Sequence, residues 1–89
     1  MPQAIVNPDD MVRFASDLGL SAEMIRQHCG AAAAEFERLS DLWRDDKYQQ
    51  FSDRFEEFVG RLRTFCNEAD EYAAFLRHKA DLAEQYLRP

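Results

Sequence analysis

A chain of 89 residues with 46% hydrophobic and 31% charged side chains has the size and composition of one small folded domain, residues 1–89. Its longest nearly apolar run, residues 29–34, is far shorter than the ~20 residues that a membrane-spanning helix requires. The net charge of −6 argues against a nucleic-acid partner, because such binding depends on Lys and Arg side chains that face phosphates.

The first six residues, Met1–Val6, lack the features of a cleaved secretory signal. They contain no basic segment, no long apolar core and no small-residue cleavage site. We therefore expect one of two cases. Either the protein stays in the cytoplasm, or it is exported from the cytoplasm by a route that does not require such a signal.

Residues 7–10 have the features of a helix N-terminus. Asn7 can cap the helix, and Pro8 occupies the first helical position, where its missing N–H costs nothing. Val6 and Met11 are placed to form a hydrophobic staple. Apolar side chains then recur at helical spacing, which predicts a helix over about 8–40. They are Phe14, Leu18, Ile25, Cys29, Ala32, Phe36, Leu39 and Trp43.

Two glycines interrupt this first helix, at Gly19 and Gly30. Each weakens a helix by up to ~1 kcal/mol relative to Ala. Either the helix tolerates them, or they allow a partner helix to approach closely. The alanine run 31–34 beside Gly30 favours close packing.

Residues 41–46 are expected to form a turn, and Asp45 or Asp46 can cap a second helix over about 47–87. Nine apolar or aromatic side chains follow at alternating spacings of three and four, as in a coiled coil of about four heptads. They are Tyr48, Phe51, Phe55, Phe58, Leu62, Phe65, Ala69, Tyr72 and Leu76. Two long helices and a short turn predict an all-α fold, an antiparallel two-helix hairpin.

The second helix carries more apolar surface than one partner helix can cover. Beside its main stripe lie Val59, Cys66, Ala73, Phe75, Leu82 and Tyr86. A lone hairpin of this size has too thin a core to offset the conformational entropy lost on folding. We therefore predict a homodimer, or a heterodimer with a similar hairpin, that forms a four-helix bundle. The side chains expected in the hairpin and dimer interfaces are Phe14, Leu18, Ile25, Phe36, Leu39, Phe55, Phe58, Val59, Leu62, Phe65, Tyr72 and Leu76.

The sequence contains no pattern typical of catalysis or of a metal site. Neither His28 nor His78 follows Glu or Asp by three or four residues, so the Glu-x-x-His pair of a di-metal bundle is missing. His28 and Cys29 are adjacent and do not share a helix face. Cys29 and Cys66 are either joined in a disulfide or are free, buried thiols. We expect no enzyme activity, no cofactor and no metal.

The turn carries a pattern found in a known family. Trp43 lies in the turn, and Phe51 follows it by eight residues in a short acidic chain of two long helices. This pattern resembles the Trp-x-Gly helical-hairpin family, the small substrates of type VII (ESX) secretion and their relatives, over about residues 8–86. Trp43 matches the motif Trp, Phe51 matches the later aromatic, and Asp45 stands where Gly is usual.

The resemblance implies a non-enzymatic hairpin that pairs antiparallel into a four-helix bundle and is exported folded, without a cleaved signal. Family members act as substrates, effectors or carriers of larger effectors. The export machinery with its ATPase recognises a surface that includes the turn. The family's Tyr-x-x-x-Asp/Glu signal is missing, because Leu76 stands four residues after Tyr72 and only three residues follow Tyr86. An exported chain would borrow the signal from its partner.

Two alternatives remain at this stage. The protein is either linked to secretion or a cytoplasmic adaptor or chaperone-like bundle that binds an apolar helix of a larger protein. Trp43 is either a lid over the apolar end of the hairpin or a partly exposed anchor for a partner, and we favour the anchor.

Overall fold

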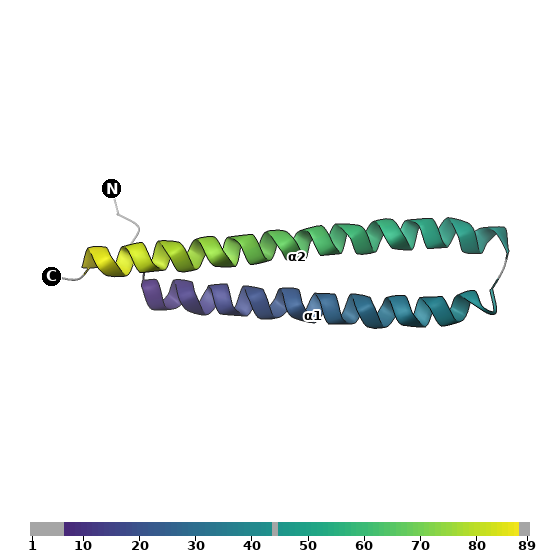
Figure 1. The fold of residues 1–89 in the computed structure, drawn as a ribbon, viewed down its shortest axis with the longest axis horizontal. Helices are drawn as coiled ribbons and strands as arrows, with labels where there is room; N and C mark the ends of the chain where they lie inside the picture. The colour runs from purple at the N-terminus through teal and green to yellow at the C-terminus, as the bar shows by residue number, and fades with distance from the viewer. Residues whose placement is uncertain (1–6, 44, 88–89) are drawn as a thin grey trace.

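The computed structural model describes residues 7–43 and 45–87. Two helices, α1 (Pro8–Ser40) and α2 (Asp46–Leu87), lie side by side in antiparallel directions and are joined by a short turn (Figure 1). The described residues contain no strand. The predicted all-helical architecture with two long, packed helices is confirmed. The hairpin is elongated, with extents of 68 × 24 × 16 Å.

The N-terminus of α1 is capped as its sequence predicts. The side-chain oxygen of Asn7 accepts hydrogen bonds from the backbone N–H groups of Asp9 and Asp10, at 2.9 and 3.3 Å. Both aspartates lie in the first turn, where negative charge is favourable next to the positive end of the helix dipole. Val6, one half of the predicted staple, lies outside the described residues.

The N-terminus of α2 is capped by Asp45 rather than by Asp46. The carboxylate of Asp45 accepts a hydrogen bond from the backbone N–H of Tyr48 at 3.0 Å. Asp46 is the first residue of α2 and adds negative charge to its first turn. Arg44, which belongs to the predicted turn, lies outside the described residues.

The two helices meet mostly through small side chains. Ala22, Cys66 and Ala69 form the centre of the interface, and Leu18 and Ile25 pack against them. The thiol of Cys66 donates a hydrogen bond to the carbonyl oxygen of Ala22 at 3.4 Å. Such small side chains allow two helices to approach closely. The buried residues of the described chain are Ala15, Ala22, Val59, Cys66, Ala69, Ala73 and Ala80.

Near the turn, aromatic side chains replace the small ones. The ring of Phe36 lies between the helices and contacts three rings of α2. Its centroid is 5.4 Å from that of Tyr48, 5.5 Å from Phe51 and 4.9 Å from Phe55. Aromatic contacts of this kind add to the stability that apolar burial provides. The turn end of the hairpin is therefore held by a cluster of rings.

The structure differs from the prediction in which apolar side chains of α2 are buried against α1. Val59, Cys66 and Ala73, expected to lie outside the hairpin, are buried between the helices. Phe58 and Phe65, expected within it, are each 53% exposed. On α2, the buried row follows the phenylalanine row by one residue, as Val59 follows Phe58. The buried alanines of α1 recur at the same seven-residue spacing. Small residues on both helices allow a close approach that leaves no room for the rings.

A polar cluster also connects the helices. The guanidinium of Arg26 donates to a carboxylate oxygen of Asp70 at 2.8 Å and to the side-chain oxygen of Asn67 at 2.9 Å. The hydrogen bond with Asp70 raises the pKa of Arg26 above its ordinary value. Because these side chains come from facing helices, the contact helps to fix their register.

Close packing at the glycines of α1 does not occur within the hairpin. A Cβ atom added to Gly19 or Gly30 would meet no atom within 4 Å, so α2 does not make the close approach at either glycine. The glycines are instead tolerated in exposed or half-exposed helix positions with helical backbone angles.

We expect Gly30→Ala to raise the free energy of unfolding by about 0.5–1 kcal/mol, because Ala loses less backbone entropy in a helix than Gly. Urea unfolding followed by circular dichroism measures the change. Unchanged or lower stability would mean that a partner occupies the space next to Gly30 in solution.

Candidate interaction surface

One long side of the hairpin exposes large apolar side chains, and we call it the apolar face. On α2, aromatic residues recur at every seventh position, so they lie in one row along the helix. On α1, apolar residues near each end lie on the same side. The members, with exposed fractions from 46% to 64%, are Phe14, Leu39, Phe51, Phe58, Phe65 and Tyr72.

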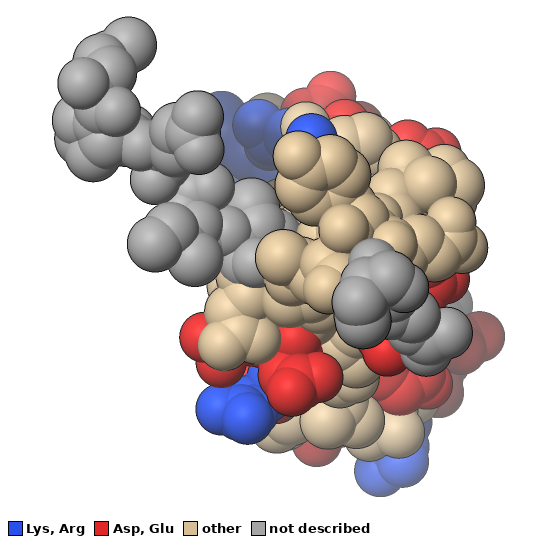
Figure 2. Space-filling view, turned by 90° about the vertical axis from the view of Figure 1, so that its left-hand side faces the viewer, with Lys and Arg blue, Asp and Glu red and all other residues tan. Residues whose placement is uncertain are grey.

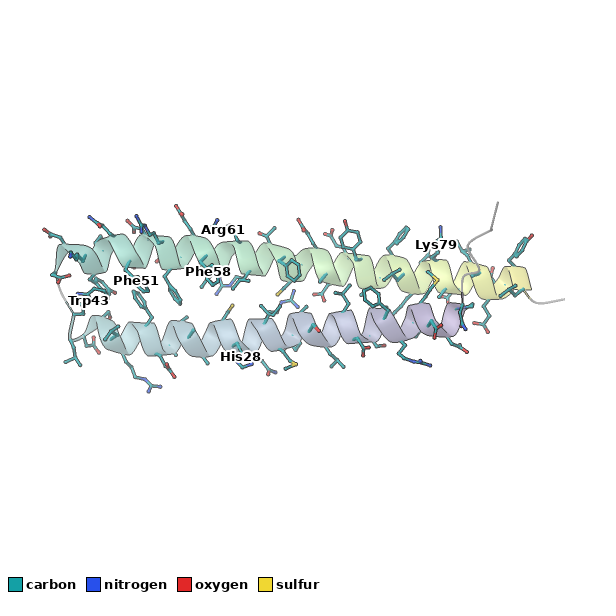
Figure 3. The ribbon with its side chains drawn as sticks, turned by 180° about the vertical axis from the view of Figure 1, so that it is seen from behind. His28, Trp43, Phe51, Phe58, Arg61 and Lys79 are labelled. Atoms are coloured by element: carbon teal, nitrogen blue, oxygen red, sulfur yellow. The ribbon has the colours of Figure 1, made fainter. Side chains whose placement is uncertain are left out.

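A shallow groove of about 330 Å³ lies in the middle of the apolar face. Its lining comes from both helices and consists of Ile25, His28, Cys29, Ala32, Phe55, Phe58, Val59 and Leu62. In Figure 3, Phe51 and Phe58 extend from the side of α2 that faces α1, whereas Arg61 and Lys79 extend from its outer edge. The groove can accept apolar side chains of a partner, and it offers His28 as its one titratable imidazole.

The opposite long side of the hairpin is polar. It carries the Arg26–Asp70 ion pair, and a cavity of about 70 Å³ there is lined in part by Arg26 and Arg63. Viewed along the hairpin from the end that carries the termini, charged side chains surround much of the perimeter and leave uncharged surface between them (Figure 2). The two long sides of the hairpin therefore have different chemistry.

The turn places Trp43 in a defined position. Its indole N–H donates a hydrogen bond to the Asp45 carboxylate at 2.7 Å, and its ring contacts those of Tyr48 and Phe51, with centroids 5.6 and 6.0 Å away. The side chain is half-buried. Leu42, which precedes Trp43 in the turn, is 87% exposed.

Asp45 has two functions that Gly at the same position cannot provide. Its carboxylate caps α2 through the Tyr48 backbone N–H, and it also accepts the indole N–H of Trp43. The backbone of the described residues contains no positive φ angle, so the conformational freedom of Gly is not required there. The hairpin therefore accommodates Asp at this position.

The predicted interface residues divide into two groups. Phe14, Leu39, Phe58, Phe65 and Tyr72 lie on the exposed apolar face. Leu18, Ile25, Phe36, Phe55, Leu62 and Leu76 are half-buried, and Val59 is buried between the two helices of the hairpin. Sequence reasoning missed Ala15, Ala22 and Ala80. Their heptad spacing, shared with Ala73, was the available signal.

The cysteines of the described chain are free thiols, and its possible metal ligands form no metal-binding cluster. Cys29 is a half-buried free thiol and Cys66 a buried free thiol, so of the two predicted alternatives the structure has the thiols. Within residues 7–43 and 45–87, no three His, Cys, Asp or Glu side chains are arranged to hold a metal ion. Neither helix, over the same residues, contains a stretch long and apolar enough to cross a membrane.

The proposal of a function rests on the sequence and the structure of this chain. No family model matches this sequence, and no curated protein matches it.

Proposed function

We propose that the protein is a non-enzymatic interaction protein that acts as a dimer of helical hairpins. The observation that carries the proposal is the apolar face. Four aromatic residues at successive heptad positions of α2 are 47–64% exposed, and an apolar surface of this extent is typical of a binding site. A stable interface needs about 800 Å² per partner, and a face with the 68 × 24 Å outline of the hairpin exceeds that area.

The proposal includes a role in type VII (ESX) secretion, as a substrate, effector or carrier exported without a cleaved signal. It is supported by the hairpin of 33- and 42-residue helices and by the half-exposed Trp43 in the turn. Phe51 packs against Trp43, so the two residues that carry the resemblance to the Trp-x-Gly family lie together. The partners are then a second hairpin and a secretion-machine ATPase or a larger effector.

The groove on the apolar face favours a second candidate function. A groove with almost entirely apolar lining can accept one face of an amphipathic helix from a larger protein. In that case the protein is a cytoplasmic adaptor or a chaperone-like bundle. Neighbouring genes separate the candidates, since a secretion-type membrane ATPase or a second Trp-x-Gly protein favours the first.

The dimer is tested with Phe58→Ser and the control Leu20→Ser. Both side chains are large, apolar and exposed, at 53% and 65%, but Leu20 lies on the outer side of α1, two residues from the buried Ala22. We expect the wild-type chain to sediment at twice its 10.4 kDa mass at micromolar concentration. Phe58→Ser should raise the dimer dissociation constant by at least about tenfold, because it removes a large apolar contact from both subunits. Leu20→Ser should leave the constant unchanged.

The helical signal in circular dichroism shows whether each variant still folds. A wild-type chain that sediments as a folded monomer across dilution would refute the dimer. Equal effects of the two substitutions would show that the apolar face is not the interface.

Export is tested by expressing the tagged chain in a bacterium with a type VII machine and in the same strain without its ATPase. The proposal expects tagged chain in the medium of the first strain alone. We expect Trp43→Ala to reduce that export more than it reduces the cellular level of the protein. Retention of the wild-type chain inside both strains would favour the adaptor.

A further inference from the structure

Resting on the proposed dimer, we infer that two copies pair through their apolar faces with both turns at the same end, so that α1 of each copy lies on α2 of the other. The argument comes from the charged residues that border the apolar face. These residues differ in sign between the two helices.

On α1, the border of the apolar face is mostly acidic. Side chains three or four positions from an exposed helical residue are its neighbours on the surface. By this spacing, Asp10 and Asp17 flank Phe14, and Glu35 flanks Leu39. We call these three residues the acidic border. One basic residue, Arg38, occupies the heptad position of Asp10 and Asp17 and interrupts this border.

On α2, the border is mostly basic. Lys47 and Arg54 flank Phe51, and Arg54 and Arg61 flank Phe58, while Lys79 occupies the heptad position after Tyr72. We call Lys47, Arg54, Arg61 and Lys79 the basic border. Figure 3 shows Arg61 and Lys79 at the outer edge of α2, away from α1. One acidic residue, Glu68, interrupts this border next to Phe65.

A symmetric face-to-face dimer has two arrangements, because its two-fold axis lies either along the hairpin or across it. An axis across the hairpin places α1 on α1 and α2 on α2, so borders of like charge meet. An axis along the hairpin places α1 on α2, so the acidic border meets the basic one. Attraction between opposite borders selects the second arrangement. It differs from the antiparallel pairing of hairpins that the family resemblance implies.

The register within one hairpin fixes which charges meet. A two-fold axis along the hairpin does not change a residue's position along the hairpin's length, which we call its level. Within one hairpin, the contact between Cys66 and Ala22 shows which residues of α1 and α2 share a level. With an equal rise per residue in both helices, Glu35 is level with Arg54, and Asp10 with Lys79, to within about one residue. Arg54 therefore faces Glu35 of the partner subunit. Glu68 comes level with Ser21, about one helical turn from Asp17 of the partner subunit, so this one position of the two borders is unfavourable.

Arg54 and Glu35 are available for this contact. Both side chains are exposed, and neither forms an ion pair within the described part of its own hairpin. The arrangement also gathers two copies of Trp43 and of the exposed Leu42 at one end of the dimer. That end is then a composite surface that neither hairpin has alone.

The first test exchanges the two charges. Arg54→Glu and Glu35→Arg should each raise the dimer dissociation constant about tenfold at low salt, because two attractions per dimer become repulsions. The double variant should return to within about threefold of wild type, since the pair is restored with opposite sign. Arg63→Glu, on the polar side, should have no effect. A double variant as weak as the product of the singles would overturn the arrangement.

The second test measures the distance between the turns. A nitroxide attached at Leu42→Cys in a Cys29→Ala chain reports this distance by pulsed electron paramagnetic resonance. Turns at the same end should give at most about 30 Å, because diagonal helices of a four-helix bundle lie about 14 Å apart and each label arm adds several ångströms. Turns at opposite ends should give a distance near the 68 Å length of the hairpin, which would overturn the arrangement and leave the dimer intact. A wild-type monomer would instead refute the proposed function together with this inference.

Discussion

Replacing Ala73 with Glu is expected to destabilise the hairpin strongly. Ala73 is 2% exposed and lies in the helix–helix interface, where the described residues bury no basic side chain that could neutralise a carboxylate. An uncompensated buried charge costs about 3–5 kcal/mol. A domain of this length has a total stability of about 4–13 kcal/mol, so this cost removes a large share of it.

The adjacent residue provides the control. Ala74 is exposed on the same helix, so Ala74→Glu introduces the same side chain with the same helix propensity but buries no charge. It should change the stability by less than about 0.5 kcal/mol. Urea unfolding at one fixed protein concentration compares the two, since dimer formation contributes to apparent stability. Similar stabilities of the two variants would contradict the helix register described here.

Replacing Trp43 with Ala is expected to lower the free energy of unfolding by about 2 kcal/mol. Removal of a fully buried large aromatic costs about 3–5 kcal/mol, and the half-buried Trp43 should lose roughly half of that. The indole packs on Tyr48 and Phe51, and its N–H bonds Asp45. Its role in packing is therefore larger than the sequence alone suggests.

Two further variants separate packing from recognition. Trp43→Phe keeps most of the ring contact and loses only the bond to Asp45, so it should cost about 1 kcal/mol. Leu42→Ala, at an 87% exposed position, should leave stability unchanged. A partner role predicts that Trp43→Phe reduces partner capture or export by more than its loss of folded protein. A loss of folded protein with partner capture intact per folded molecule would leave Trp43 as a purely structural side chain.

The helices themselves could be predicted because their determinants are local. Asn7 and Pro8 begin α1 through backbone geometry and a side-chain cap that lie within a few residues. The heptad pattern after the turn specified a long helix, but its phenylalanines divide between the helix interface, where Phe55 contacts Phe36, and the exposed apolar face. The prediction of the hairpin required no further information, since two long amphipathic helices with a short connection must pack against each other.

The side of α2 that faces α1 could not be read from the sequence. Two stripes with the same heptad period lie one position apart, and reasoning from hydrophobicity favours the larger rings of Phe58 and Phe65. In the hairpin, Ala22 faces Cys66, and these small side chains permit a close approach of the helices.

The sequence by itself therefore determined the number of helices, their ends and their antiparallel pairing, because caps, turns and periodicity act over a few residues. Only the tertiary structure decided that the alanine stripe is buried and the aromatic stripe exposed. The reason is that burial depends on how side chains from both helices fit together at one interhelical distance. The same fit creates the apolar face, on which the proposed function depends.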